Sequence, residues 1–261
     1  MNQLFDIACN FTHEAFANDL DEVINSAVNA GVNKFLVVSA ELTDQPSINK
    51  IVKNNNCYFT TGVHPHHAKT FNSDSVLKMH ELVSKYNPNA LGEMGLDFFR
   101  NISSYEEQMY AFEEQIKLAI KFNKPLFLHQ RESHKPFIKL IDKYKNDIDK
   151  AVVHCFTGTQ NELDDYLDNG FYVGLTGWIC DERRNKELRK SIKNIPLDKL
   201  MIETDSPYLI PRNLSPKPNK NRNEPKYLMH IANEIAKLRE EPLELICEST
   251  YKNGEDFFSL T

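Results

Sequence analysis

Pro125-Leu126-Phe127-Leu128-His129 and Ala151-Val152-Val153-His154 are short apolar runs that each end on a histidine. Two further runs, Ala90-Leu91-Gly92-Glu93 and Leu200-Met201-Ile202-Glu203-Thr204-Asp205, end on carboxylates in the same way. A buried strand that ends on an ionisable residue is a poor way to build a core, because a buried polar group needs a partner. Four such strand ends in one chain therefore indicate a metal-dependent hydrolase, in which the four side chains meet around a cation.

Apolar runs and amphipathic stretches alternate along the whole chain. We predict strands near residues 4–9, 34–39, 57–63, 89–93, 125–129, 151–155, 171–175 and 199–204. Segments with helical spacing lie at residues 15–30, 43–55, 74–86, 104–122, 134–146, 160–168 and 182–193, and two more follow at 225–239 and 241–258. Such alternation favours parallel strands joined by right-handed crossovers. We expect one domain over residues 1–261, an α/β fold of the (β/α)₈ TIM-barrel type, with the metal site at the C-terminal rim of the strands.

The overall charge and the cysteine content narrow the class of protein. The chain of 261 residues carries a formal net charge of −6 with a pI near 5.9, which argues against a scaffold that coats nucleic acid but not against an enzyme with a metal-lined cleft. The five cysteines include no Cys-x-x-Cys pair, and no glycine-rich phosphate turn follows the first strand. The residues Met1-Asn2-Gln3-Leu4-Phe5-Asp6 lack the basic then apolar layout of a signal peptide, and no apolar stretch approaches the ~20 residues of a membrane span. We expect a cytoplasmic protein that does not contact membranes.

The four strand ends suit metal-assisted hydrolysis. Glycines close to Glu93 on both sides would let backbone and ligand approach each other. His129 and His154 occupy the same place in consecutive strands, where neutral imidazoles suit Zn, Mn or Fe and tolerate Mg when carboxylates share the site. We expect Asp205 to bind the metal and to act as the general base that takes a proton from water. Glu203, two residues earlier on the same side of the strand, is expected to orient a ligand or a water.

Three further groups of side chains are candidates for contact with the substrate. His64, in His64-Pro65-His66-His67, follows the third strand and is placed at the rim, within reach of the metal or of a substrate phosphate. We expect His66 and His67 to be solvated loop residues. Arg131 and Arg222 are candidates for gripping a phosphate, because the planar guanidinium donates two parallel hydrogen bonds. A surface ion pair is the alternative for each arginine.

The segment 211–225 is rich in proline, asparagine and lysine and follows the last predicted strand. We interpret it as a long loop on the active rim, with a plain surface loop as the alternative.

Several of these motifs, in this order and spacing, resemble those of TatD-type deoxyribonucleases, and the match runs nearly end to end. The motifs are Gly62-Val63-His64-Pro65-His66, Gly92-Glu93-Met94-Gly95-Leu96-Asp97, Leu128-His129-Gln130-Arg131, His154-Cys155-Phe156-Thr157-Gly158, Glu203-Thr204-Asp205-Ser206-Pro207-Tyr208 and Arg222-Asn223-Glu224-Pro225. The resemblance implies a metal site built from Glu93, His129, His154 and Asp205. It also implies 3′–5′ exonuclease action on single-stranded DNA, with RNA as a further candidate substrate, magnesium as the activator and a role in DNA repair.

One departure from the broad family pattern concerns the end of the first strand. Many relatives carry His-x-His there, whereas this chain has Asn10 and Thr12 at the two positions. The branch of TatD proper resembles this chain in that substitution and in the segment 177–184. Asn and Thr offer neutral oxygen donors, which bind more weakly than imidazole. We therefore expect weakly held Mg²⁺, completed by a substrate phosphate, with Mn²⁺ or Zn²⁺ as alternatives.

Two other functions stay open at the level of sequence. A small-molecule amidohydrolase or lactonase would keep the barrel and the metal, but such enzymes often use the first-strand His-x-His and a bridging modified lysine on the fourth strand, where this chain has Glu93. A non-catalytic binding or scaffold protein would keep the histidines at the rim for structural reasons. Nothing in the sequence marks an interface between subunits, so we expect a monomer.

Overall fold

All eight predicted strands form one parallel sheet in the computed structural model, which describes residues 3–55, 57–218 and 221–260. The strands are β1 (Leu4–Cys9), β2 (Val32–Val37), β3 (Cys57–Thr61), β4 (Ala90–Asp97), β5 (Leu126–Arg131), β6 (Ala151–Val153), β7 (Tyr172–Leu175) and β8 (Leu200–Ile202). Their order in the sheet is their order in the chain. Beyond β8, Ser206 bridges to Cys9, and Asn10 donates a backbone hydrogen bond of 2.9 Å to Ser206. This bridge closes the sheet, and the predicted (β/α)₈ barrel is confirmed.

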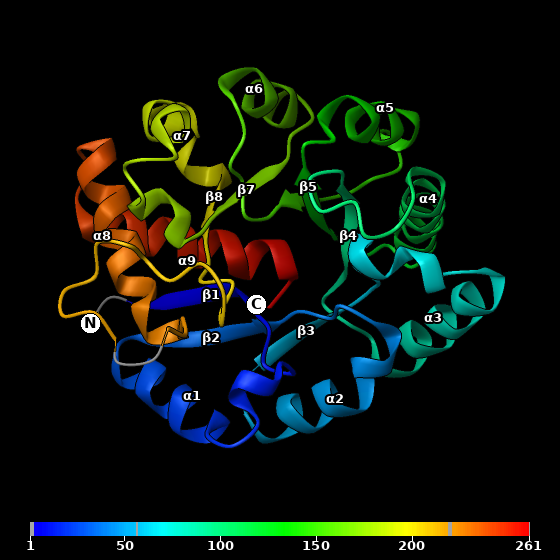
Figure 1. The fold of residues 1–261 in the computed structure, drawn as a ribbon, viewed down its shortest axis with the longest axis horizontal. Helices are drawn as coiled ribbons and strands as arrows, with labels where there is room; N and C mark the ends of the chain where they lie inside the picture. The colour runs from blue at the N-terminus through cyan, green and yellow to red at the C-terminus, as the bar shows by residue number, and fades with distance from the viewer. Residues whose placement is uncertain (1–2, 56, 219–220, 261) are drawn as a thin grey trace.

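Helices join successive strands and lie around them, and two more helices follow the last strand (Figure 1). They are α1 (Leu20–Asn29), α2 (Gln45–Asn54), α3 (Ser73–Tyr86), α4 (Tyr105–Lys121), α5 (His134–Tyr144), α6 (Gln160–Asp168), α7 (Lys186–Ser191), α8 (Leu228–Arg239) and α9 (Leu243–Phe258). Short 3₁₀ turns η1–η7 lie at Glu14–Phe16, Leu42–Asp44, Pro65–Thr70, Gly177–Cys180, Ile192–Asn194, Leu197–Lys199 and Pro225–Tyr227. The first predicted helix, over residues 15–30, is thus divided: η1 precedes α1, with His13 accepting a hydrogen bond from Ala15 N at the cap of η1.

Hydrogen bonds between side chains and backbone in its first turn fix where α4 begins. The Ser104 hydroxyl accepts a hydrogen bond from Glu107 N, and the Glu107 carboxylate accepts one from Ser104 N. This reciprocal pair satisfies two donors that a helix start otherwise leaves unpaired. The loop between β4 and α4 is therefore short and ends at a defined residue.

The strands are apolar on both faces because the barrel buries both. Side chains such as Phe5, Phe127 and Met201 fill the barrel interior, whereas neighbouring strand residues pack against the helices. Phe258 of α9 contacts Phe5 with ring centroids 5.7 Å apart, and Phe257 contacts Tyr172 at 5.1 Å. These partners stand at or near the starts of their strands. The end of α9 therefore closes one end of the barrel, and the functional side chains lie at the other.

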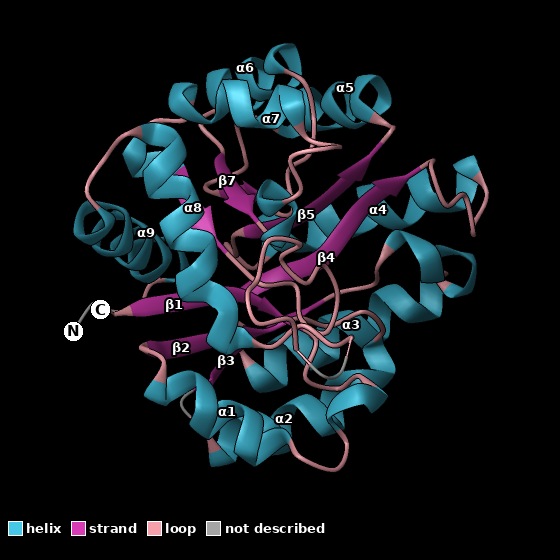
Figure 2. Cartoon of the chain, turned by 60° about the vertical axis from the view of Figure 1, so that its left-hand side comes forward, coloured by secondary structure: helices cyan, strands magenta, loops and turns pink. Residues whose placement is uncertain are grey.

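The strand β4 runs to Asp97, four residues beyond its predicted end. Its arrowhead and that of β5 point away from α9 and extend past the other strands in Figure 2. The rim of the barrel on this side is therefore built from rigid sheet. Within the described residues, no helix combines the length and the apolar character needed to cross a membrane.

Candidate metal centre

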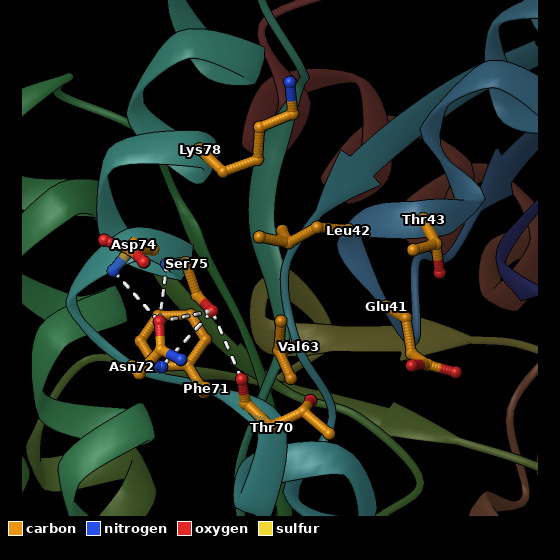
Figure 3. A pocket seen from close by; sticks show the side chains of 10 residues that line it. All are labelled: Glu41, Leu42, Thr43, Val63, Thr70, Phe71, Asn72, Asp74, Ser75 and Lys78. Atoms are coloured by element: carbon orange, nitrogen blue, oxygen red, sulfur yellow. Dashed lines mark hydrogen bonds between the residues drawn. The ribbon is translucent and has the colours of Figure 1, made fainter.

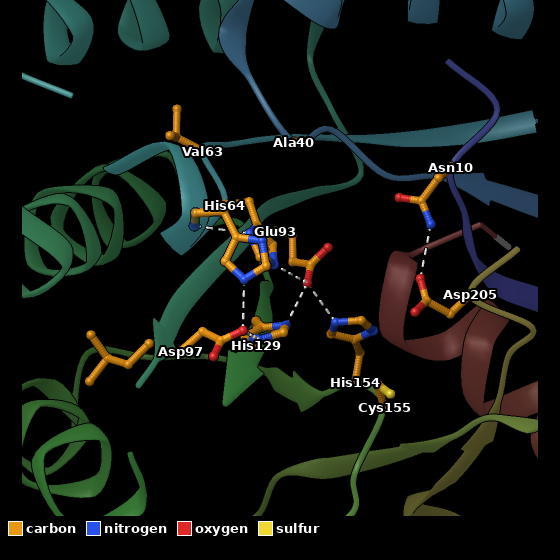
Figure 4. Close-up of polar contacts among 12 residues, drawn as sticks. Asn10, Ala40, Val63, His64, Glu93, Asp97, His129, His154, Cys155 and Asp205 are labelled. Atoms are coloured by element: carbon orange, nitrogen blue, oxygen red, sulfur yellow. Dashed lines mark hydrogen bonds and ion pairs between the residues drawn. The ribbon is translucent and has the colours of Figure 1, made fainter. Parts of the chain in front are cut away.

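The centre of the site is the carboxylate of Glu93, on which three imidazoles converge (Figure 4). Glu93 Oε1 lies 3.2 Å from His64 Nε2, 2.8 Å from His129 Nδ1 and 2.7 Å from His154 Nε2. The residue is 6% exposed, so these contacts occur at the bottom of the rim rather than in open solvent. One carboxylate and three imidazoles form a set of ligands that divalent metals favour.

Two glycines bring Glu93 against its neighbours. Gly92 and Gly95 have φ values of 144° and 147°, which side chains on L-residues rarely tolerate. A Cβ atom at Gly95 would lie 1.9 Å from the backbone oxygen of His129, and one at Gly92 would lie 2.2 Å from that of Phe127. The absence of side chains therefore lets β4 approach β5 closely, and this close approach places Glu93 beside His129.

Asp97 is a member of the site that sequence reasoning missed. Its side chain is 1% exposed, and Oδ2 lies 2.7 Å from His66 Nε2 and 3.4 Å from His129 Nε2. His66 is therefore bound to the site by Asp97, and the expectation of a solvated His66 is wrong. Alternation along β4 was a usable signal, because residues 93, 95 and 97 face the same side of a strand.

His67, by contrast, is a surface residue, as expected. It is about two-fifths exposed, and its Nδ1 lies 3.4 Å from Glu41 Oε1 at the surface.

Glu203 stands behind His154. Its Oε1 lies 3.4 Å from His154 Nδ1, the nitrogen opposite the one that faces Glu93, and it accepts a short hydrogen bond from Cys155 N. Glu203 is fully buried. A carboxylate on the second nitrogen of a histidine fixes the tautomer and the orientation of the ring.

Strand alternation does not relate Glu203 to Asp205, although the sequence pattern predicted that it would place both on the same side of the last strand. The strand β8 ends at Ile202, and Asp205 has a φ of 53°, so the chain has left the extended conformation and alternation no longer applies. The turn directs the Asp205 carboxylate toward the first strand, where Oδ1 accepts a hydrogen bond of 2.9 Å from Asn10 Nδ2. Thr12 lies two residues further along, in the turn after β1.

Burial and neighbouring charges give the ionisable groups different protonation states. Burial raises the pKa of Asp205 to about 7, and the Glu93 and Glu203 charges act in the same direction against His154 and Asn10. Burial would also raise the pKa of Glu93, but the charges of His154 and His64 and the bonds from His129 and His154 outweigh it and hold that pKa well below its usual range. Burial lowers the pKa of His64 to about 4. At neutral pH the site thus presents an ionised Glu93 and a neutral His64.

Several buried polar atoms of the cluster fit a bound cation. Ligand atoms of His64, Glu93 and His129 all lie within 4.8 Å of one another. Among the described residues, His129 Nε2, His154 Nδ1 and Glu203 Oε2 are buried without a hydrogen bond. The two nitrogens face the carboxylates of Asp97 and Glu203 at 3.4 Å, while the opposite ring nitrogens face Glu93. Unsatisfied buried groups are costly unless a ligand engages them or their neighbours. His64 belongs to this group of three, whereas His154, which contacts Glu93 Oε1 at 2.7 Å, and Asp205 are not members of it.

Arg222 is fully engaged in a structural network. Its guanidinium donates hydrogen bonds of 2.8 Å to both carboxylate oxygens of Asp19 and one of 2.8 Å to Glu224, and its side chain is 13% exposed. A substrate phosphate would have to displace two carboxylates. Arg222 is therefore corrected from a phosphate ligand to a residue that holds the long loop onto α1.

The long loop does lie on the active rim. Asn223 donates a side-chain hydrogen bond of 2.8 Å to Thr204 O and a backbone one of 3.0 Å to Pro207 O, next to the end of β8. Residues 219 and 220 of the predicted loop lie outside the described residues.

Arg131, by contrast, is exposed at the end of β5. Its Cζ lies 3.9 Å from the centroid of the Phe99 ring. Arg131 thus stands exposed at the end of β5, with its guanidinium against the Phe99 ring.

A separate pocket of about 350 Å³ lies between the β2–α2 and β3–α3 connections (Figure 3). Its polar wall is the cap of α3: Asn72 Oδ1 accepts hydrogen bonds from Asp74 N and Ser75 N, and the Ser75 hydroxyl donates to Thr70 O. These groups bond to one another, and the pocket adds no ligand to the cluster around Glu93.

Comparison with known proteins places the chain in a family. Residues 5–259 match the family model described as TatD related DNase. The chain is 41% identical over 259 residues to the "3′-5′ ssDNA/RNA exonuclease TatD" of Pantoea ananatis, covering 98% of this chain and 100% of the relative. A crystal structure of a TatD homolog from Escherichia coli K12 superposes with a TM-score of 0.91 at 25% identity, covering 100% and 99% of the two chains. A hydrolase TatD family protein from Entamoeba histolytica gives 0.90 at 28% identity over the full length of both. The predicted resemblance is confirmed, and the chain belongs to the family of TatD related deoxyribonucleases.

Proposed function

We propose that the chain is a metal-dependent 3′–5′ exonuclease that hydrolyses phosphodiester bonds in single-stranded DNA and RNA. The observation that carries the proposal is the convergence of His64, His129 and His154 on Glu93 Oε1 at one rim of the barrel. The activity in the name of the Pantoea ananatis relative, which matches over its full length, supports the same substrate class.

The proposed metal ligands are Glu93, His129, His154 and Asp205, with His64 beside them. A divalent cation held there would polarise the scissile phosphate and lower the pKa of an adjacent water. Magnesium is the proposed cation, because the first strand offers Asn10 and Thr12 rather than two imidazoles, and hard, weakly held Mg²⁺ accepts neutral oxygen donors. Activity that requires Zn²⁺ and fails with Mg²⁺ would reject this choice.

The protein's own groups have distinct proposed roles. Asp205 takes the proton of the attacking water from the side of the first strand, with its orientation set by the hydrogen bond from Asn10. Glu203 holds the ring of His154 through Nδ1, so that Nε2 faces the centre. His64 and Arg131 are the proposed contacts of the substrate phosphate.

The deciding experiment is a time course on single-stranded oligonucleotides labelled at the 5′ or the 3′ end, in Mg²⁺, Mn²⁺ or EDTA. A 3′–5′ exonuclease shortens the 5′-labelled strand stepwise and releases the 3′ label at once as a mononucleotide. EDTA should abolish the reaction. Asp205→Asn should lower kcat by about 100-fold or more, the upper part of the range for a lost general base. Asp142→Asn, at an exposed position on the outer face of α5, is the matched control with wild-type activity. Full cleavage in EDTA, or by Asp205→Asn, would refute the proposal.

A role in DNA repair, in the cytoplasm, belongs to the same proposal. The five cysteines are free thiols, which suits a reducing compartment. An exonuclease of this polarity could remove damaged 3′ ends. A strain without the gene should survive peroxide less well, and the wild-type gene should restore survival where the Asp205→Asn gene does not. Equal rescue by both genes would separate the repair role from the nuclease.

The proposed functional unit is a monomeric single domain. The sheet is continuous from β1 to β8 and closes on itself, so one chain supplies every residue of the centre. Light scattering during gel filtration should give the mass of one chain, 30.2 kDa.

A further inference from the structure

We propose that Phe99 and Arg131 form a platform on which an unpaired base of the substrate strand stacks, beside the metal centre. This inference rests on the proposed nuclease function and adds the feature by which that site selects single strands.

The loop between β4 and α4 exposes an unusual amount of apolar surface. Phe99 and Ile102 are each 52% exposed and Tyr105 is 49% exposed, within seven residues that follow Asp97 closely. Single exposed apolar residues are common, but a cluster at the mouth of a site indicates a binding surface. Phe99 is the member closest to the centre in sequence.

The position of Phe99 is fixed relative to the metal centre by the sheet. Asp97 pairs with Arg131 across β4 and β5, and Phe98 N donates a hydrogen bond of 3.0 Å to Arg131 O. Phe99 follows two residues after Asp97, so its backbone lies within about 7 Å of that residue. Asp97 in turn contacts His66 and His129. A base on Phe99 would therefore belong to a nucleotide next to the scissile phosphate.

The loop that carries the platform is held rigidly. Gln108, which is 1% exposed, accepts a hydrogen bond of 2.8 Å from Asp97 N and donates one of 2.8 Å to Ser103 O, so it ties the two ends of the loop together. Arg100 N donates one of 2.8 Å to Asp97 Oδ1 inside the loop. An ordered platform costs little entropy when a ligand binds.

Charge at the platform suits a nucleic acid strand. The guanidinium of Arg131 stacks on Phe99, with Cζ 3.9 Å from the ring centroid. Among the described residues, no carboxylate lies within ion-pair distance of Arg131 or of Arg100, the residue that follows Phe99. Arg222, in contrast, has two such carboxylates. Both arginines are exposed in a chain of net charge −6. An aromatic face beside unneutralised guanidinium groups is the combination that binds an unpaired base and its phosphate.

Base stacking explains why a single strand is preferred. Inside a duplex both faces of a base are covered by neighbours, and at a duplex end the last base is still paired and stacked on one side, so a base is free to move onto Phe99 only after it is unpaired and unstacked. Stacking on an aromatic side chain accepts every base, because each has a π-face. The platform therefore predicts selection for single strands without selection for sequence.

The test measures binding and cleavage with the full-length protein and oligothymidylate of a dozen residues. Binding is followed by fluorescence anisotropy in EDTA, and kcat and KM are measured in Mg²⁺. Phe99→Ala should weaken binding and raise KM by about 5- to 100-fold, with kcat nearly unchanged. Phe99→Tyr should restore binding. Tyr110→Ala, which removes a 41% exposed aromatic ring from α4, is the matched control and should bind like the wild type.

Two further measurements distinguish base stacking on Phe99 from a general structural effect of the substitution. Oligonucleotides with one abasic residue at each of the first four positions from the 3′ end should bind the wild type more weakly at one position, and Phe99→Ala should lose that sensitivity. Arg131→Gln should lower the slope of log affinity against log salt by about 0.7, the effect of one phosphate contact on a single strand, whereas Phe99→Ala should leave the slope unchanged.

The outcomes distinguish this proposal from the proposed function. If Phe99→Ala binds and cleaves like the wild type, or keeps the same abasic sensitivity, the platform is wrong and the nuclease assignment stands. If binding depends on Phe99 but no variant or metal gives cleavage, the platform stands and the nuclease assignment fails. If the wild type does not bind oligothymidylate, both are wrong.

Discussion

Asn10 donates a hydrogen bond of 2.9 Å from Nδ2 to Asp205 Oδ1, across the seam where the first and the last strand of the barrel meet. The same amide group lies 3.2 Å from Ser206 O. Asn10 therefore holds the carboxylate of Asp205 in place. This hydrogen bond within the site links the segment after the first strand to the segment after the last strand.

Removal of this bond should impair catalysis. Asn10→Ala frees Asp205 to turn away from the centre, and we expect kcat to fall by about 10- to 100-fold, as for partners that orient a ligand. Thr12→Ala removes the other neutral oxygen donor of the first strand but no hydrogen bond to Asp205, so kcat should fall less than in Asn10→Ala. Steady-state kinetics on a single-stranded oligonucleotide would check both variants, and equal losses would contradict the separate role of Asn10.

Local patterns predicted the fold, and they singled out strand-end residues that the structure brings close together around Glu93. Strand ends such as Glu93 and His129 are visible because an apolar run stops abruptly at a ligand-type side chain. Arg131 and Arg222 looked alike in sequence, since each lies in a polar segment. The partner that separates them, Asp19, is 203 residues away from Arg222, and only the folded chain shows that contact. Likewise, the left-handed turn at Asp205 is a tertiary feature that strand alternation does not foresee.

The Arg222 network should contribute to stability rather than to substrate binding. Arg222→Gln should lower the free energy of unfolding by about 1–3 kcal/mol, because hydrogen bonds between charged, mostly buried groups are lost. Asp19→Asn should have a similar effect, and the double variant should cost less than the sum of the two. Denaturant unfolding measures these values. A large rise in KM for Arg222→Gln with unchanged stability would restore the phosphate role.

Asp6 should make the folded state less stable as pH rises toward neutrality. Burial raises the pKa of Asp6 from 3.8 to about 7, against hydrogen bonds from Thr204 and Ala8. Between these values the unfolded chain has released a proton that the native state keeps, so the Asp6 contribution is greatest below the unfolded pKa and is lost as pH rises to the folded one. The loss amounts to at most about 1.4 kcal/mol per pH unit.

The Asp6→Asn variant isolates this contribution. Its free energy of unfolding should fall less between pH 5 and pH 7 than that of the wild type, while the exposed-site variant Asp142→Asn should follow the wild type. Parallel curves for the wild type and Asp6→Asn would show that Asp6 is ionised throughout this range.

Gly95 and Gly170 both have positive φ, yet they should respond differently to alanine. At Gly170, with φ of 74°, no atom lies within 4 Å of an added Cβ, so Gly170→Ala should cost only the backbone strain of about 1–2 kcal/mol. At Gly95, with φ of 147°, the Cβ would lie 1.9 Å from His129 O, and β4 must separate from β5 to relieve the clash. Gly95→Ala should therefore lose more than about 3 kcal/mol.

The loss at Gly95 should extend to the metal centre, because the same strand contact positions Glu93 against His129. Calorimetric titration with Mn²⁺ should show weakened binding for folded Gly95→Ala and normal binding for Gly170→Ala. If Gly95→Ala bound Mn²⁺ like the wild type, the close approach of β4 and β5 would not be what assembles the site.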